Sequence, residues 1–135
     1  MSKVAVVYWS GTGHTEAMAN AIAEAAGAEL FTAVEFDAAK VPEYDVIAFG
    51  CPSMGAEELE EAEFAPMFEA CKPALAGKNI ALFGSWGWGS GEWMNTWEED
   101  CRSIGANLIA DSVICQDEPD DAALAACKAL GEAIR

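Results

Sequence analysis

The chain has 135 residues, 53% of them hydrophobic, which suits one domain that buries roughly two thirds of its unfolded surface and argues against disorder. Seven basic against 23 acidic residues give a formal net charge of −16, which excludes binding through nucleic-acid phosphates or to an anionic membrane surface. No apolar run approaches the roughly 20 residues of a membrane helix, and the apolar start of the chain leads into a glycine loop instead of a signal-peptide cleavage site.

Predicted strands alternate with predicted helices along the chain. Continuous apolar runs predict strands buried on both faces, as in a parallel sheet, at Val4–Trp9, Val46–Cys51 and Ile80–Phe83. Weaker patterns predict two further strands, at Leu30–Phe36 and Leu108–Cys115. We therefore predict an α/β fold with a single, doubly wound, five-stranded parallel sheet and helices on both faces. In such sheets, ligands bind beyond the carboxyl ends of the strands.

The first predicted strand is followed by SGTGHTE, Ser10 to Glu16, which opens a helix. Its glycines let backbone N–H groups converge on an anion, and the hydroxyls of Ser10, Thr12 and Thr15 add donors at the positive end of the helix. The segment lacks the G-K-[ST] of a Walker A loop and the third glycine of G-x-G-x-x-G. Since no Lys or Arg occurs between Lys3 and Lys40, we predict a site for a buried phosphate monoester held mainly by neutral donors.

The third and fourth predicted strands end in GCPSMGAEELEE and GSWGWGSGEW. A phosphatase Cys-x5-Arg loop starting at Cys51 would need arginine at position 57, which holds Glu57, so we predict a buried strand-end thiol at Cys51. Met54 precedes Gly55, which can take a positive φ in a turn. Met54 on one loop and Trp88 on the other could enclose a planar ring between them.

The later tryptophans follow a helical pattern. Trp93, Trp97, Cys101 and Ile104 lie at i, i+4, i+8 and i+11, so we predict that both tryptophans are core residues and not site residues. A second stripe predicts the final helix, at Ala123, Cys127, Leu130 and Ile134. Trp86 and Trp88 belong to neither stripe.

Cysteine and acidic residues complete the composition. The five cysteines are widely spaced, without C-x-x-C, and the chain has one histidine, so we expect reduced thiols in a cytoplasmic protein with no disulfide framework and no metal site. Acidic residues cluster at 57–63, 98–100 and 117–121. These clusters have two interpretations that the sequence leaves open, solubility or a docking face for basic partners.

The segments SGTGHTE, CPSMGAEE and GSWGWGSGEWM, in this order and each after a strand, resemble the phosphate loop and the two ring-binding loops of short-chain flavodoxins. The resemblance runs over essentially the whole chain, down to QDEPD at 116–120. It implies one FMN-binding domain over residues 1–135, a sheet with strand order 2-1-3-4-5, for which flavodoxin is itself the standard example, and an uninterrupted fifth strand. We also expect a monomer.

The resemblance further implies the roles of individual residues in binding FMN. Trp88 would stack on the outer face of the isoalloxazine ring, Met54 would cover the inner face, and Glu57 would accept the ring N3–H. The role of Trp86 stays open between ribityl packing and partner contact. His14, Ala56 and Pro52 depart from the residues common in the family. The full predicted cofactor site comprises Ser10, Gly11, Thr12, Gly13, His14, Thr15, Ser53, Met54, Gly55, Ala56, Glu57, Ser85, Trp86, Gly87, Trp88 and Gly89.

The chain offers no general base, nucleophile or nicotinamide site, so we predict an electron carrier and not an enzyme. The resemblance implies shuttling mainly between the semiquinone and the hydroquinone at low potential, in a ferredoxin-like role with redox enzymes as partners. The alternative is an FMN-dependent NAD(P)H:quinone reductase, which would be expected to need longer loops or a second subunit. A flavin-free receiver or phosphatase lacks its acidic pocket or Cys-x5-Arg signature.

Overall fold

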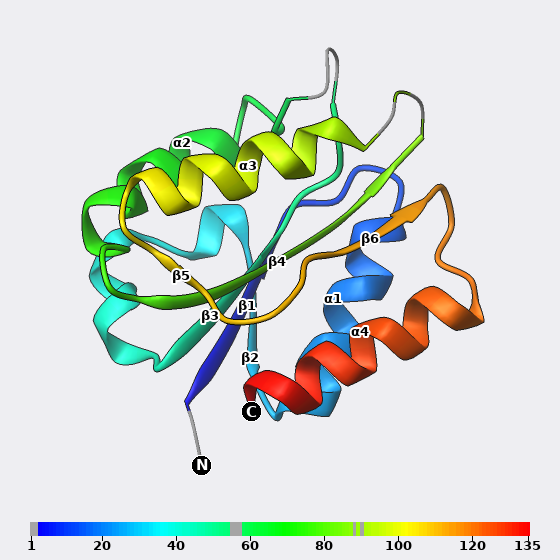
Figure 1. The fold of residues 1–135 in the computed structure, drawn as a ribbon, viewed down its shortest axis with the longest axis horizontal. Helices are drawn as coiled ribbons and strands as arrows, with labels where there is room; N and C mark the ends of the chain where they lie inside the picture. Colours follow the sequence, from blue (N-terminus) through cyan, green and yellow to red (C-terminus); the bar gives the residue numbers. More distant parts are fainter. Residues whose placement is uncertain (1–2, 55–57, 88, 90) are drawn as a thin grey trace.

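The computed structural model describes residues 3–54, 58–87, 89 and 91–135 (Figure 1). Its strands are β1 (Val4–Tyr8), β2 (Glu29–Thr32), β3 (Val46–Gly50), β4 (Asn79–Trp86), β5 (Asn107–Leu108) and β6 (Val113–Gln116). Its α-helices are α1 (His14–Ala26), α2 (Phe64–Cys71), α3 (Glu92–Ser103) and α4 (Asp121–Ile134). Short 3-10 helices occur at η1 (Ala33–Glu35), η2 (Ala38–Glu43) and η3 (Lys72–Ala74).

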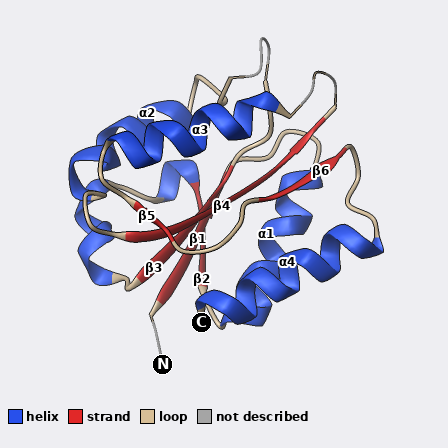
Figure 2. Cartoon of the chain, in the orientation of Figure 1, coloured by secondary structure: helices blue, strands red, loops and turns tan. Residues whose placement is uncertain are grey.

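The strands form one sheet in the order β2-β1-β3-β4-β5, which confirms the predicted topology. Every strand pair is parallel. All side chains of β1 and β3 are buried because helices cover both faces of the sheet (Figure 2). The carboxyl ends of β1, β3, β4 and β6 consequently meet at one edge.

The prediction of an uninterrupted fifth strand is wrong. The segment is split into β5 and β6, each of which pairs with β4. Leu108 pairs with Ile80 and Val113 pairs with Phe83. The stretch 109–112 therefore has two more residues than the part of β4 that it passes, and it leaves the ladder. A hydrogen bond of 2.6 Å from Ser112 Oγ to Glu98 Oε2 ties this stretch to α3.

The second strand also ends earlier than predicted, at Thr32 instead of Phe36. Glu35 Oε1 accepts hydrogen bonds from the backbone N–H and the hydroxyl of Thr32, at 2.8 and 2.9 Å. This capping box starts η1 directly after the strand. The apolar pattern of residues 33–36 thus belongs to a helical turn and its flank.

Two apolar layers cover the sheet, one beneath α2 and α3 and the other beneath α1 and α4 (Figure 1). The first layer is rich in aromatic side chains, and Phe68 packs edge-on against Phe49 and Trp97 at ring centroid distances of 5.2 and 5.6 Å. Trp93 and Trp97 are 2% and 3% exposed in this layer, which confirms them as core residues. No helix in the described part of the chain is long and apolar enough to cross a bilayer.

Candidate cofactor site

The loops after β1, β3, β4 and β6 surround a hollow of about 220 Å³ at the carboxyl edge of the sheet. Tryptophan, methionine and small polar side chains form its wall. The lining residues are Trp9, Gly11, Thr12, His14, Pro52, Ser53, Met54, Ser85, Trp86, Gly87 and Asp117. Segments that lie far apart in sequence are thus brought together where a doubly wound sheet binds its ligands.

The loop after β1 is held in shape by the hydroxyl of Ser10. Ser10 Oγ accepts hydrogen bonds from the backbone N–H of Gly13 at 3.1 Å and of Glu16 at 3.2 Å. Gly13 caps α1 with a φ of 94°, a left-handed conformation that favours glycine. The loop therefore delivers the chain to the N-terminus of α1, where N–H groups and the helix dipole favour an anion.

Two predicted hydroxyls meet beneath this loop. Thr15 Oγ1 lies 2.9 Å from Ser85 Oγ, and the two residues are only 1% and 4% exposed. Thr15 belongs to the first turn of α1 and Ser85 to the end of β4. The pair joins the predicted phosphate loop to the strand that leads into the tryptophan-rich loop.

Trp9 links the β1 loop to the segment before α2. Its Nε1–H donates a hydrogen bond of 2.9 Å to Glu63 Oε1. Trp9 also lines a second, more polar hollow of about 520 Å³. The other residues that line it are Tyr8, residues 10–13, Glu16, Thr32, Val34 and Glu63. Tyr8 donates to Glu16 Oε2 at 3.1 Å, and burial, with Glu16 adding to the effect, raises the pKa of Tyr8.

The loop after β3 folds back on itself. Met54 and Glu58 exchange two backbone hydrogen bonds, each of 2.8 Å, across residues 55–57. Ser53 N–H donates to the carbonyl of Ser85 at 2.9 Å, which fixes this loop against β4. The Met54 side chain is 38% exposed at the hollow. An apolar group in the hollow would therefore contact it.

Cys51 lies at the end of β3 and is fully buried, which confirms the predicted strand-end thiol. Burial raises the pKa of Cys51 to about 12, with the nearby Glu60 carboxylate adding to the rise and the Glu60 N–H opposing it. A thiol with this pKa is protonated at neutral pH and is a poor nucleophile.

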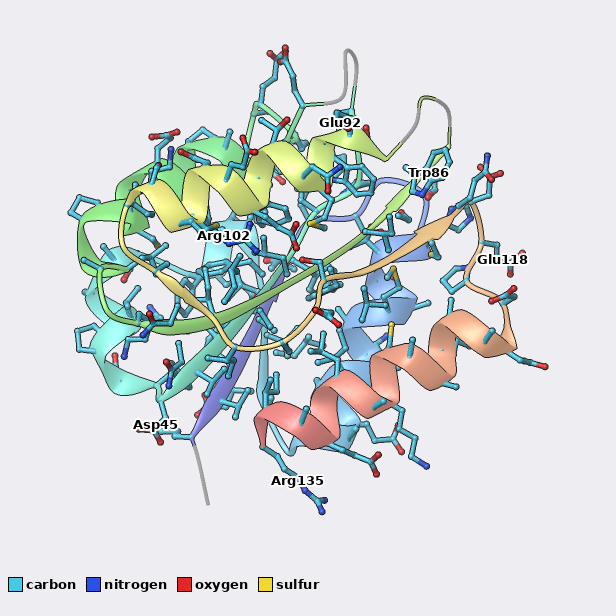
Figure 3. All side chains as sticks on the ribbon, viewed as in Figure 1. Asp45, Trp86, Glu92, Arg102, Glu118 and Arg135 are labelled. Atoms are coloured by element: carbon cyan, nitrogen blue, oxygen red, sulfur yellow. The ribbon has the colours of Figure 1, made fainter. Side chains whose placement is uncertain are left out.

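Strand β4 ends at Trp86, whose side chain lies near the end of β6 (Figure 3). Asp117 N–H donates to the Trp86 carbonyl at 2.7 Å, and Asp117 takes a φ of 57°. The same figure shows Glu118 on the segment between β6 and α4. The end of β6 therefore closes one wall of the hollow and adds an acidic side chain to it.

Most of the predicted site residues gather at this edge. Eight of them line the first hollow, while Ser10 and Gly13 line the second and Thr15 bonds to Ser85. Gly89 is described but lines neither hollow. The predictions for Gly55, Ala56, Glu57 and Trp88 lie outside the described residues.

Three residues that line the first hollow are not in the predicted site, namely Trp9, Pro52 and Asp117. Trp9 was assigned to the first strand, whereas β1 ends at Tyr8. Asp117 follows the last strand of the sheet, and applying the strand-end rule to that strand as well would have found it.

The donor set of the described residues fits a phosphate-bearing planar group such as FMN. Three hydroxyl-bearing residues (Thr12, Ser53 and Ser85) and His14 at the start of α1 line the hollow together with Trp9, Met54 and Trp86. Neither Lys nor Arg lines either hollow at this edge in the described part of the chain. A phosphate here would be held by neutral donors, as the sequence predicts.

Comparison with known proteins agrees with this geometry. The sequence profile of the family described as Flavodoxin matches residues 6–131. The flavodoxin of Megasphaera elsdenii is 48% identical over 136 residues, which cover 96% of each chain. The flavodoxin of Clostridium beijerinckii is 42% identical and covers 87% of this chain and 88% of its own. The solution structure of two-electron reduced Megasphaera elsdenii flavodoxin has a TM-score of 0.88, with 46% identity over 97% of each chain.

Fold and site together define a doubly wound α/β protein with a ligand site at the carboxyl ends of its parallel strands. The chain belongs to the flavodoxin family. Membership in this family supports an FMN-binding electron carrier.

Proposed function

We propose that this protein is a low-potential electron carrier that holds FMN non-covalently in the hollow and cycles mainly between its semiquinone and hydroquinone forms. The observation that carries the proposal is that polar residues near the start of α1 and large apolar side chains line one hollow at the carboxyl edge of the sheet. Thr12 and His14 at the N-terminal end of α1 line the same hollow as Trp9, Met54 and Trp86. This arrangement supports a ligand with a phosphate at one end and a flat ring at the other. FMN supplies the redox chemistry, and the protein sets its potential.

The proposed roles divide between the loops. Residues 10–15 and Ser85 would bind the phosphate, and Ser53, Met54 and Gly55 to Glu57 would contact the inner side of the ring. Trp88 would cover the outer face, and residues 86, 87 and 89 would approach the ring edge or the ribityl chain. The buried Cys51 thiol, with its raised pKa, is not suited to covalent catalysis.

The charge of −16 supports two further parts of the proposal. A carboxylate about 10 Å from an anionic ring opposes it by roughly 1.7 kcal/mol at an effective dielectric near 20, and salt reduces this severalfold. Acidic surroundings therefore favour a low potential for the step that forms the anion. They also favour partner enzymes with basic docking faces. The proposed site of action is the cytoplasm, with the protein as a monomer.

A potentiometric titration of the protein loaded with FMN tests the proposal. The visible spectrum should show bound flavin, and the second one-electron potential should lie far below that of free FMN. Neutralising the exposed Glu58 and Glu61 should raise that potential by tens of millivolts, since about 59 mV corresponds to a tenfold change for one electron. An absence of flavin binding would refute the proposal, and an unchanged potential would refute its electrostatic part.

A second measurement separates an electron carrier from a quinone reductase. Under anaerobic conditions, NADH or NADPH alone should leave the bound flavin oxidised, whereas a dedicated flavodoxin reductase should reduce it. Rapid reduction by NADH or NADPH alone, followed by turnover with a quinone, would favour the reductase.

A further inference from the structure

Glu60 differs from the acidic residues around it because its carboxylate is buried. The side chain is 6% exposed, whereas Glu58, Glu61 and Glu63 are exposed. Glu60 Oε1 accepts hydrogen bonds from the N–H groups of Glu63 at 2.7 Å and Phe64 at 2.8 Å, and Oε2 accepts one from Ala62 at 2.7 Å. Burial by itself would raise the pKa of Glu60, but these three hydrogen bonds outweigh it and lower the pKa below its ordinary value. The group is therefore an ionised carboxylate in the interior at neutral pH.

The backbone of Glu60 joins two elements. Its N–H donates to Cys51 Sγ at 3.3 Å, at the end of β3. Its carbonyl accepts from Ala65 N–H at 2.8 Å, in the first turn of α2. Glu60 thus fixes the return of the loop to the strand it left nine residues earlier.

Two contacts to the candidate cofactor site depend on this arrangement. The Met54–Glu58 backbone pair lies within the segment that Cys51 and Glu60 close, and Met54 and Glu60 line a common hollow of about 320 Å³. Glu63, whose N–H donates to Glu60, sends its own carboxylate to Trp9 Nε1. The Met54–Glu58 pair therefore fixes Met54 at the hollow proposed to bind the flavin ring. The Trp9–Glu63 hydrogen bond fixes Trp9 beside the β1 loop.

We propose that Glu60 is a positioning residue of the cofactor site, which holds the Met54 loop and the Trp9–Glu63 contact in register with each other. The inference rests on the proposed binding of FMN. Glu60 would not touch the cofactor, and its negative charge is already met by three amides, so it acts through geometry and not as one of the surface charges.

The chemistry of the carboxylate makes the inference specific. Both oxygens of Glu60 accept hydrogen bonds, whereas the amide of glutamine has one acceptor and one donor. In Glu60→Gln, an NH₂ group must face either Ala62 N–H or the N–H groups of Glu63 and Phe64. A donor facing a donor opens the turn at that point. Glu61→Gln removes the same charge from an exposed neighbour and is the matched control.

The experiment has a readout in the apoprotein and one in the complex. In the apoprotein, the indole N–H resonance of Trp9 in Glu60→Gln should shift and exchange with solvent about tenfold faster, while Glu61→Gln leaves it unchanged. In calorimetric titration with FMN, Glu60→Gln should bind about tenfold more weakly, equivalent to about 1.4 kcal/mol. Glu61→Gln should bind FMN as tightly as the wild type or slightly more tightly.

Leu130→Ala controls for lost stability, because Leu130 is a buried residue of α4 on the opposite face of the sheet. It should destabilise the fold without moving the Trp9 resonance. Glu60→Asp, which keeps the charge on a shorter side chain, provides a milder variant should Glu60→Gln fail to fold, and it should show the same two effects at smaller size. Equal FMN affinity and an unchanged Trp9 resonance in both Glu60 variants would overturn the inference. A wild type that binds no FMN would refute the proposed function, while the Trp9 resonance would still test the contact.

Discussion

The loops after β1 and β3 meet at the same edge of the sheet but are stabilised by different chemistry. The β1 loop is short and neutral, and a single hydroxyl, Ser10 Oγ, accepts hydrogen bonds from the N–H of Gly13 in the loop and of Glu16 in the first turn of α1. The longer β3 loop depends on the buried carboxylate of Glu60, which accepts three. In the proposed complex with FMN, these neutral donors would leave the phosphate as the main charge at one end of the site. In the β3 loop, the buried carboxylate of Glu60 is hydrogen-bonded to three backbone amides, whereas its neighbours Glu58, Glu61 and Glu63 are exposed. Acidic residues adjacent in sequence therefore have different structural roles.

Trp93→Ala should give the largest effect, because it removes the packing beneath both the β3 and β4 loop ends. Trp93 is 2% exposed, and its Cζ2 is 3.2 Å from where a Cβ on Gly84 would lie. Loss of a buried tryptophan typically costs about 3–5 kcal/mol of unfolding free energy. Urea unfolding of the apoprotein measures it. A loss below about 1 kcal/mol would show that the site can collapse around the missing ring.

Glu60→Gln should lower the unfolding free energy by about 2 kcal/mol at neutral pH, since hydrogen bonds to a charged group are stronger than neutral ones. The lowered pKa of Glu60 gives the sign of the pH dependence. Its ionised form stabilises the fold above the unfolded-state pKa, and this contribution is lost as pH falls through the folded-state pKa. The difference between wild type and variant should therefore shrink in acid. Unfolding curves between about pH 3 and pH 7 test this, and a constant difference would contradict it.

Thr15→Val should lower the unfolding free energy by about 1–3 kcal/mol, because it leaves the buried Ser85 hydroxyl without its partner. Thr12→Val, on the exposed part of the same loop, is the control and should change stability by less than about 0.5 kcal/mol. Denaturant unfolding of the two apoprotein variants compares them. Equal losses would show that the hydroxyl pair does not contribute to the β1 loop.

Trp88→Ala tests the ring side of the comparison through affinity. By its place in the family pattern, Trp88 should stack on the flavin, and stacking contributes roughly 1–3 kcal/mol per base or ring. FMN affinity should fall about tenfold or more, with little change in the stability of the apoprotein. Fluorescence titration of FMN measures the affinity. If Trp88→Ala destabilised the apoprotein as much as Trp93→Ala while FMN still bound tightly, the two tryptophans would have exchanged roles.

The sequence predicted the bounds of β1 and β3 closely and those of the other strands less well, since β4 spans Asn79–Trp86 and not only Ile80–Phe83. Val4–Trp9 and Val46–Cys51 each exceed the observed strand by one residue. These strands are buried on both faces, so their apolar runs have few alternatives. The second and fifth strands lie toward the edges, where a local capping box and two extra residues decide the backbone path. A hydrophobic pattern predicts neither the capping box at Thr32 nor the two extra residues between β5 and β6.

The candidate site was also predicted in part. Strand ends and glycine loops predicted the β1, β3 and β4 segments, because helix N-termini and parallel topology leave few other places for an anion. Asp117 was not predicted because the strand-end rule was applied to the first, third and fourth strands and not to the last one, which ends at Gln116. Glu60 was grouped with its acidic neighbours, because composition does not distinguish a buried carboxylate from an exposed one.

The Thr15–Ser85 pair also bears on how the protein matures. These hydroxyls are 70 residues apart in the chain, and the contact between Cys115 and Met18 spans 97. Contacts of such long range form only after most of the chain has been ordered, because closing long loops costs entropy that local structure does not repay. A chain still emerging from the ribosome can therefore make the β1 loop but not the complete hollow. On the proposed function, FMN would therefore be taken up by the released, folded protein and not by partly synthesised chains.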